Sequence, residues 1–248
     1  MDLGLKNKMV FITGASSGIG AEAARLFAEE GADVVVSYGK NKDGAEATAR
    51  KVREAGRKAW LLPMDLAKPE KVKAEIGKLP AEIEGLDGLV LCAGLSLHTA
   101  FEEITSEEWK RVLDINLTGT FFVLQALTPR LLDGAGVVVV ASVSAQTGVA
   151  HQAHYAAAKA GLVNLTKSAA RALAPRVRVN CVTPGITLTP MGQETIDALD
   201  PDYARNKMLL QRYATPEEIA RAIVFLASPA NSFMTGATVD INGGRDLR

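Results

Sequence analysis

Cysteine and histidine are scarce in this sequence, which has two cysteines and three histidines among 248 residues. Cys92 and Cys181 lie far apart, each within an apolar run. A disulfide framework needs several cysteines, and a zinc site needs more ligands than two thiols and three scattered imidazoles supply. We therefore expect reduced thiols in the core and no metal site.

An excess of charge of either sign is also missing, because 28 Lys and Arg residues balance 28 Asp and Glu residues. A protein that binds nucleic acid or an anionic membrane through its overall field needs a basic excess. Apolar runs such as residues 137–141 are far too short to cross a bilayer, and residues 1–4 lack the features of a signal peptide. We expect a cytoplasmic protein that binds neither nucleic acid nor membrane.

Short β-branched apolar runs alternate with longer segments of helical periodicity, the pattern of a parallel sheet covered by helices. The pattern predicts an α/β fold in one domain over residues 1–248, a doubly wound parallel sheet of about seven strands with helices on both faces. The expected strands are residues 9–13, 34–38, 59–64, 88–92, 137–142, 177–182 and 238–241.

One segment departs from this alternation. Residues 187–215 mix Pro190, Gly192 and Pro201 with short helical stretches. Irregular segments of this kind often close over a bound substrate. We therefore expect a substrate lid at about residues 187–215.

A glycine-rich turn follows the first expected strand. Gly14, Gly18 and Gly20 have the spacing G-x-x-x-G-x-G and lead directly into a helix rich in Ala, Glu and Leu. Free backbone N–H groups and the positive end of the helix dipole converge at such a turn, and glycines let a pyrophosphate approach the backbone. The turn predicts a dinucleotide cofactor.

A tyrosine and a lysine share one face of a later helix. Tyr155 and Lys159 are four residues apart, and Ser142 ends the fifth expected strand, where the carboxyl edge of the sheet presents side chains to ligands. A lysine ammonium near a phenol favours the phenolate and lowers its pKa from a usual value near 10. The three side chains are candidates for proton transfer.

The chain resembles the short-chain dehydrogenase/reductase family over essentially its whole length, because the family's motifs occur in order. They are residues 13–20, Asp65-Leu66, residues 92–94, Asn116, Ser142, Tyr155 with Lys159, and Pro184-Gly185 followed by Thr189. The resemblance implies a Rossmann fold with Tyr155 as general acid or base and Ser142 as a hydrogen-bond donor to the substrate oxygen. It also implies that Lys159 tunes Tyr155 and binds the ribose, and that Asn116 organises a proton-relay water.

The same resemblance implies a set of cofactor-binding residues. They are Gly14, Ser16, Ser17, Gly18, Ile19, Gly20, Tyr38, Gly39, Lys40, Asp65, Leu66, Cys92, Ala93, Gly94, Tyr155, Lys159, Pro184, Gly185, Thr187 and Thr189. Where the family usually shows Asn-Asn-Ala-Gly, this chain has Leu91-Cys92-Ala93-Gly94. A cysteine cannot replace the hydrogen bonds of an asparagine amide, so the change bears on cofactor affinity rather than on activity.

The end of the second strand favours NADP(H) over NAD(H). Tyr38 stands where an acid would bind the ribose 2′-hydroxyl and repel a 2′-phosphate, and Lys40 or Lys42 is available to pair with that phosphate. Ser17, however, stands where many NADP-dependent members carry Arg or Lys. NAD(H) therefore stays open as the alternative.

The expected substrate site is mostly apolar, as suits a small or acyl carbonyl compound. Its expected residues are Ser142, Gln146, His151, Gln152, Tyr155, Ile186 and Met191. Within the family the chain most resembles 3-oxoacyl-(acyl-carrier-protein) reductases. Residues 131–136, before the fifth strand, carry Asp133 rather than the basic residues that would receive an acidic carrier protein.

Two alternatives stay open. A sugar, polyol or other alcohol dehydrogenase of the same family would use the same motifs. A catalytically silent cofactor-binding regulator is the other, although it would typically have lost the Ser, Tyr or Lys. The resemblance also implies a homotetramer or dimer assembled through the helices expected at 106–131 and 152–174.

Overall fold

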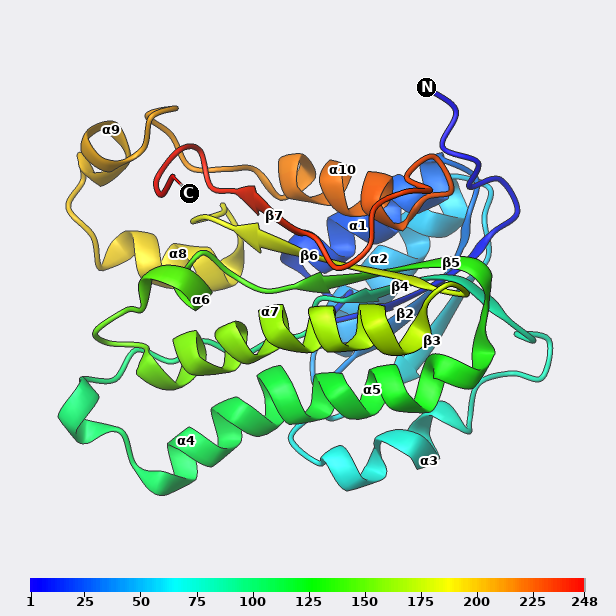
Figure 1. Cartoon of the computed structure of the whole chain (residues 1–248), viewed down its shortest axis with the longest axis horizontal. Helices are drawn as coiled ribbons and strands as arrows, with labels where there is room; N and C mark the ends of the chain where they lie inside the picture. The colour runs from blue at the N-terminus through cyan, green and yellow to red at the C-terminus, as the bar shows by residue number, and fades with distance from the viewer. Residues whose placement is uncertain (248) are drawn as a thin grey trace.

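Seven parallel strands form one sheet in the computed structural model, which describes residues 1–247 (Figure 1). They lie in the order β3-β2-β1-β4-β5-β6-β7. Their bounds are β1 (Met9–Thr13), β2 (Asp33–Tyr38), β3 (Ala59–Pro63), β4 (Leu86–Leu91), β5 (Leu131–Val140), β6 (Arg178–Pro184) and β7 (Thr238–Ile241). Every expected strand overlaps an observed one, and the predicted α/β fold is confirmed.

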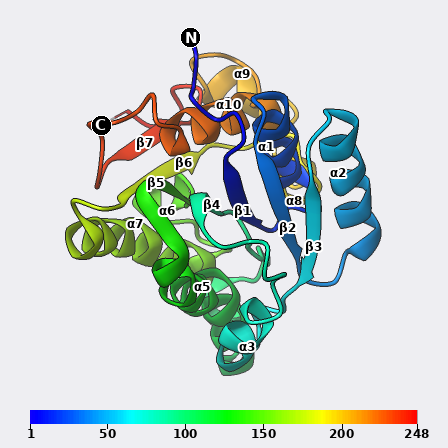
Figure 2. The ribbon, with the colours of Figure 1, turned by 90° about the vertical axis from the view of Figure 1, so that its right-hand side faces the viewer.

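Helices cover both faces of the sheet (Figures 1 and 2). One face carries α1 (Gly18–Glu29), α2 (Lys42–Glu54) and α10 (Pro216–Ala227). The other carries α3 (Val72–Ile76), α4 (Ser106–Leu113), α5 (Gly119–Leu127) and α7 (Ala153–Leu173). Three further helices lie toward the carboxyl ends of the strands: α6 (Ser144–Thr147), α8 (Pro190–Asp197) and α9 (Tyr203–Lys207).

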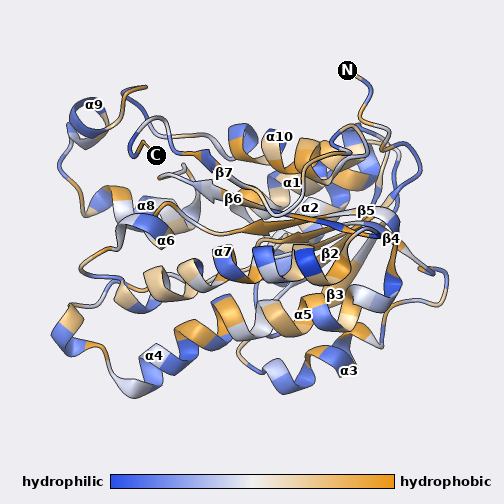
Figure 3. Ribbon diagram, viewed as in Figure 1, coloured by the Kyte–Doolittle hydropathy of each residue, from blue (hydrophilic) through white to orange (hydrophobic). Residues whose placement is uncertain are grey.

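The strands divide the interior into two cores, because successive side chains of a strand point to opposite faces. In β1, Val10 and Ile12 belong to the core beneath α1 and α10, whereas Phe11 belongs to the core beneath α5 and α7. All three side chains are fully buried. Figure 3 shows the resulting pattern, with hydrophobic strands between helices of mixed character.

The helix expected over residues 106–131 is present over residues 106–130, but it is not regular. After α4 the chain makes a π-helical stretch, Asp114–Thr118, then continues as α5 and ends in a 3-10 turn, Thr128–Arg130. The Asn116 amide donates to the Val112 carbonyl, which competes with the regular α-helical pattern at this point. The expected helix is therefore present over residues 106–130, with a π-helical turn inside it.

The fifth strand begins earlier than expected. Leu131 is buried and pairs with Leu86, so residues 131–136 belong to β5 rather than preceding it. The pairing of β4 with β5 shifts register between Leu86 and Gly88. At the other end β5 stops at Val140, so Ser142 lies in the loop just beyond the strand.

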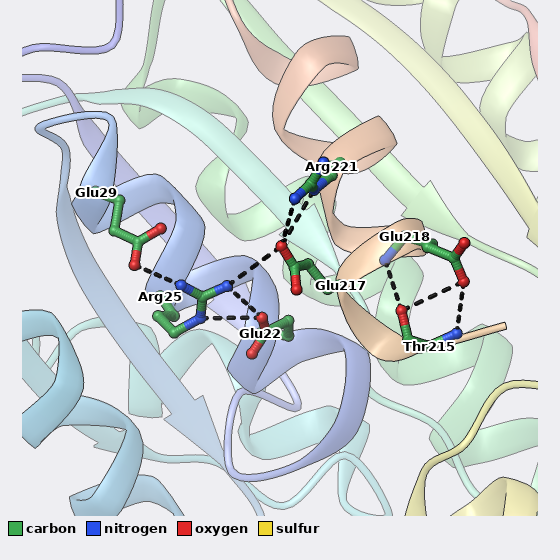
Figure 4. Close-up of polar contacts among 7 residues, drawn as sticks. All are labelled: Glu22, Arg25, Glu29, Thr215, Glu217, Glu218 and Arg221. Carbon is green, nitrogen blue, oxygen red and sulfur yellow. Dashed lines mark hydrogen bonds and ion pairs between the residues drawn. The ribbon is translucent and has the colours of Figure 1, made fainter.

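An ion-pair network joins α1 to α10 across the protein surface (Figure 4). Arg25 of α1 binds Glu22 and Glu29 of its own helix and lies 3.9 Å from Glu217 of α10, which also pairs with Arg221. Exposed pairs of this kind each contribute about 0–1 kcal/mol. The network therefore orients α1 on α10, while the buried apolar contacts beneath it contribute most of the stability of the packing between the two helices.

The segment expected as a lid, residues 187–215, contains α8 and α9 and stands away from the helical layers (Figure 1). Its two ends meet, since Thr187 forms a bridge with Ala214. Thr189 caps α8 by accepting a hydrogen bond from the Gly192 N–H at 2.9 Å. Across residues 1–247, no helix combines the length and the apolar character that crossing a membrane requires.

One glycine sets the distance between the sheet and α10. A Cβ on Gly136 of β5 would collide with the carbonyl oxygen of Ala227, the last residue of α10. Gly136→Ala is therefore expected to lower the free energy of unfolding by about 1–3 kcal/mol, the usual cost of overpacking. Gly39→Ala is the matched control, because a Cβ on Gly39 has no neighbour within 4 Å. Denaturant unfolding of both variants without cofactor tests this, and equal loss in the two would contradict it.

Candidate active site

A cavity of about 570 Å³ opens at the carboxyl ends of the strands. It lies where strand order reverses, since β1 has β2 on one side and β4 on the other. Open parallel sheets bind ligands at this reversal. All twenty residues expected to bind the cofactor line this cavity, and its volume lies in the range of ligand sites.

The glycine-rich turn has a geometry that only glycine allows at its key positions. Gly14 has φ +67°, and a Cβ there would lie 2.7 Å from the Cα of Ala93. A Cβ on Gly18, which has φ +54°, would lie 3.0 Å from the Cγ2 of Thr189. A Cβ on Gly20 would meet the Gly14 carbonyl oxygen. The absence of side chains at these glycines therefore lets the ends of β1 and β4 and the start of α1 approach one another closely.

The start of α1 is open to an anion. Its N-cap residue, Ser17, makes no side-chain capping bond, and the first turn holds no acidic residue. Uncapped N–H groups and the helix dipole favour negative charge at that point. The residues present therefore fit the pyrophosphate of a dinucleotide.

The hydroxyl of Thr13 holds the strand end where the family's asparagine is replaced. It accepts hydrogen bonds from the backbone N–H groups of Cys92 at 3.0 Å and Ala93 at 3.1 Å. The backbone path past the cavity therefore does not depend on an asparagine amide. Burial raises the pKa of Cys92 to about 11, so this residue is a neutral thiol.

The end of β2 carries no acidic residue. Tyr38, Gly39, Lys40 and Asn41 line the cavity there, and Lys40 is exposed. Asp65, after β3, is the one acidic residue in the lining of the described chain, and its carboxylate accepts a hydrogen bond from the Ala67 N–H at 3.1 Å. The β2 end therefore offers one cation and no carboxylate to a ligand.

Ser142, Tyr155 and Lys159 lie together in the middle of the cavity lining. The Ser142 hydroxyl accepts hydrogen bonds from the Ser144 N–H at 3.2 Å and from the Ser144 hydroxyl at 2.9 Å, and it also contacts Tyr155. The Lys159 ammonium donates to the Val140 carbonyl at 2.9 Å and lies 5.4 Å from the centre of the Tyr155 ring. The loop after β5 and the helix α7 thus bring the three groups together.

Burial controls the protonation of this cluster. It raises the pKa of Tyr155 to about 12, although the hydrogen bond with Ser142 opposes the rise, and it lowers the pKa of Lys159 to about 8. The net pKa of the phenol therefore lies above its usual value, and burial outweighs the lowering that was expected from a nearby lysine. Tyr155 therefore carries its proton at neutral pH.

Asn116 lies behind the cavity rather than in its lining. Its amide donates to the Leu95 carbonyl at 2.8 Å, and its Oδ1 accepts from the Leu95 N–H at 3.2 Å. A Cβ on Gly94 would lie 2.8 Å from that Oδ1 and 3.5 Å from the Lys159 Nζ. Asn116 therefore braces the turn after β4 beside Lys159, and the π-helical stretch turns it toward that loop.

The expected substrate residues divide into two groups. Gln152, Ile186 and Met191 line the cavity with Ser142 and Tyr155. Gln146 and His151 are outside the cavity lining, which corrects that part of the expectation. Gln146 binds the Asp240 carboxylate at 2.9 Å, and His151 is exposed.

Other residues of the cavity lining belong to no motif in the sequence. Ser96 belongs to a polar group with the expected Gln152 and with His98, which is outside the lining. The Gln152 amide lies 2.8 Å from the Ser96 hydroxyl and 2.9 Å from the His98 Nε2. The lining residues that the sequence did not single out include Leu95, Ser96, Arg111, Ile115, Thr195, Leu199, Tyr203 and Arg245. Most come from loops and helix faces whose direction depends on the whole fold. Among residues 1–247, no three His, Cys, Asp or Glu side chains gather as a metal site would require.

Known proteins resemble this chain along almost its whole length. The family model described as Enoyl-(Acyl carrier protein) reductase matches residues 14–246. The 3-oxoacyl-[acyl-carrier-protein] reductase FabG of Staphylococcus epidermidis is 36% identical over 241 residues, which cover 96% of this chain and 98% of the relative. A cis-4-hydroxycyclohexanecarboxylate dehydrogenase of Sinomonas cyclohexanicum is 40% identical over 244 residues, 96% of each chain.

A solved structure agrees with these relatives. The crystal structure of a short chain dehydrogenase from Burkholderia cenocepacia J2315 in complex with NADP superposes with a TM-score of 0.92. The two proteins are 31% identical, and the match covers 98% of this chain and 100% of the other. The motifs, the strand order and the whole-length matches agree, and the chain belongs to the short-chain dehydrogenase/reductase family.

Proposed function

We propose that this protein is an NADP(H)-dependent oxidoreductase that interconverts a carbonyl group and a secondary alcohol. The observation that carries the proposal is the shared cavity of Ser142, Tyr155 and Lys159 with the glycine-rich turn. A nicotinamide cofactor bound there supplies the hydride in reduction and accepts it in oxidation. The protein's own task is to bind, to orient the oxygen and to move one proton.

The proton moves at the Tyr155 hydroxyl. Because burial keeps this phenol protonated at neutral pH, it can donate to the carbonyl oxygen as the alcohol forms. The Ser142 hydroxyl, fixed by its two bonds from Ser144, donates its own proton to the same oxygen and orients it. The Lys159 cation beside the ring stabilises the phenolate that remains. Oxidation of the alcohol runs through the same groups in reverse.

Different parts of the cavity lining would bind different parts of the cofactor. The turn at residues 14–20 would hold the pyrophosphate, and Asp65 with Leu66 would contact the adenine. The carboxylate-free end of β2 and the exposed Lys40 favour a 2′-phosphate, hence NADP(H) over NAD(H). The NADP complex of the Burkholderia relative supports this choice.

The preferred substrate is a 3-oxoacyl thioester. The identity to the Staphylococcus reductase supports it, as does the mostly apolar cavity. The alternative is an alcohol dehydrogenase acting on a sugar, a polyol or a cyclic alcohol, and the 40% identity to the hydroxycyclohexanecarboxylate dehydrogenase favours the cyclic alcohol. The family model's description names an enoyl reductase, whereas the neighbouring hydroxyls of Ser142 and Tyr155 suit a carbonyl oxygen better. A silent regulator would not need an intact Ser142, Tyr155 and Lys159.

The outer face of α4 and α5 supports assembly into a homotetramer or dimer. Trp109, Phe121 and Phe122 are 42%, 40% and 37% exposed, and the two phenylalanine rings stack edge to face at 5.3 Å. Exposed aromatic patches mark contact surfaces. Phe121→Glu is expected to lower the molar mass in solution, measured by light scattering, while Lys51→Glu, at an exposed position of α2 on the other face of the sheet, leaves it unchanged.

Residues 187–215 form a second element of the proposal. We propose that this segment closes over the substrate.

Removing the Tyr155 hydroxyl tests the mechanism. Tyr155→Phe is expected to lower kcat with NADPH and an acetoacetyl thioester by about 10²–10⁴-fold, because general acid catalysis contributes that much. Cofactor binding, measured by fluorescence titration, is expected to stay near that of the native chain. Tyr213→Phe is the control, since Tyr213 is absent from the cavity lining. Activity retained in Tyr155→Phe would refute the proposal, and faster turnover of 4-oxocyclohexanecarboxylate than of the thioester would select the alternative substrate.

A carboxylate added at the end of β2 tests the cofactor preference. Gly39→Asp introduces an acid into open space, where it would repel the 2′-phosphate. We expect KM for NADPH to rise by about 10-fold or more while KM for NADH stays nearly constant, because a repulsion of about 1.4 kcal/mol changes affinity tenfold. Lys40→Ala is expected to act in the same direction, and Lys42→Ala, outside the lining, to have little effect. Equal effects on the two cofactors would contradict the preference.

A further inference from the structure

Helix α7 begins just before Tyr155, and its first turn lacks an ordinary cap. The N-cap residue, Gln152, makes no side-chain capping bond, because its amide points to Ser96 and His98 instead. The Nδ1 of His154 takes the place of the cap by accepting a hydrogen bond from the backbone N–H of Tyr155 at 2.9 Å. The backbone of the proton donor is thus held directly by its neighbour's side chain.

His154 is held in turn from another helix. Its side chain is 0% exposed, and its Nε2 lies 2.9 Å from Oε1 of Glu108, in the first turn of α4. Because Nδ1 accepts a hydrogen bond, the imidazole proton resides on Nε2, where it is donated to the carboxylate. The two contacts together require one neutral tautomer.

Glu108 has a second partner in the loop that follows β4. The Thr99 hydroxyl donates to the same Oε1, and the Thr99 N–H donates to the His151 carbonyl at 2.9 Å. The hydrogen bonds from Thr99 and then His154 hold the pKa of Glu108 below its usual range, and Arg111 on the same helix acts in the same direction. Glu108 therefore stays ionised and joins three segments: α4, the β4 loop and the start of α7.

Apolar packing near Tyr155 gives this turn little support. The neighbouring residues of α7 are alanines at positions 153, 156, 157 and 158, whose side chains are small. The first large and fully buried apolar side chain further along α7 is Leu162, two turns away. The first turn of α7 therefore depends on polar contacts in addition to the packing of small alanine side chains.

We propose that Glu108 and His154 form a clamp, a pair of positioning residues that fix the first turn of α7 and so aim the Tyr155 hydroxyl at the substrate oxygen beside Ser142. Neither side chain belongs to the cavity lining, so both act through Tyr155. The inference rests on the proposed role of Tyr155 as proton donor. Small displacements of a reacting group reduce turnover strongly, whereas binding of a cofactor held elsewhere is spared.

A series of substitutions at His154 tests the inference. His154→Leu removes the acceptor and is expected to lower kcat by about 10–100-fold with KM for NADPH nearly unchanged. His154→Asn carries its Oδ1 where Nδ1 lies and is expected to restore most of kcat. His154→Gln reaches toward Glu108 but offers no acceptor to Tyr155, so it is expected to stay slow. Native kcat in His154→Leu, or rescue by Gln instead of Asn, would overturn the inference.

Milder variants guard against misfolding. Glu108→Gln and Thr99→Val are expected to lower kcat in the same way with a smaller effect, while Glu107→Gln, an exposed neighbour on α4, leaves it unchanged. Equal effects of Glu107→Gln and Glu108→Gln would refute the clamp. Nitrogen-15 NMR of labelled histidine is expected to show one imidazole fixed as the neutral Nε2–H form, lost in His154→Leu. This signal does not depend on activity, and its absence would also refute the clamp.

The outcome for the clamp is separable from that for the function. Tyr155→Phe is measured in the same assay. If Tyr155→Phe loses turnover and the His154 series does not, the clamp fails and the proposed function stands. If Tyr155→Phe keeps turnover, the proposed function itself fails.

Discussion

The reversal of strand order at β1 is the constraint on which the rest of the site depends. Chain connections leave β1 toward β2 on one side, while β4 lies on the other side, so the loops after these strands diverge and leave a crevice. The hydroxyl of Thr13 ties the two strand ends together across this point. The glycines that follow let α1 begin directly at the crevice. The proposed cofactor and substrate contacts all lie around this crevice.

Burial has a larger influence on the reactive groups than their mutual charges do. The phenol of Tyr155 and the ammonium of Lys159 share a helix face. Loss of solvent nevertheless raises the pKa of the phenol and lowers the pKa of the ammonium, so both shifts favour the neutral form. Cys92, at the end of β4, responds in the same way. The Tyr155 oxygen and the Cys92 sulfur therefore keep their protons at neutral pH.

Local patterns in the sequence predicted the strands and the residues that lie at their ends, since apolar runs and glycine spacing act over a few residues. The i, i+4 relation of Tyr155 and Lys159 is also local. Prediction failed where a side chain's direction depends on distant elements. Gln146 turns to Asp240 of β7, and Arg245 reaches the cavity from the last turn of the chain. The start of β5 at residue 131 was missed because its partner residues in β4 are joined through an irregular register.

The π-helical stretch between α4 and α5 has a consequence for how this family member can vary. One extra residue in a helical turn rotates everything beyond it by about 100° relative to a regular helix. Asn116 faces the β4 loop, and Phe121 faces outward, only in this rotated arrangement. Loss of a single residue from Asp114–Thr118 would bring one of these two side chains to the wrong face. Insertions and deletions in related sequences should therefore avoid this stretch, even though it lies in a helix with exposed surface.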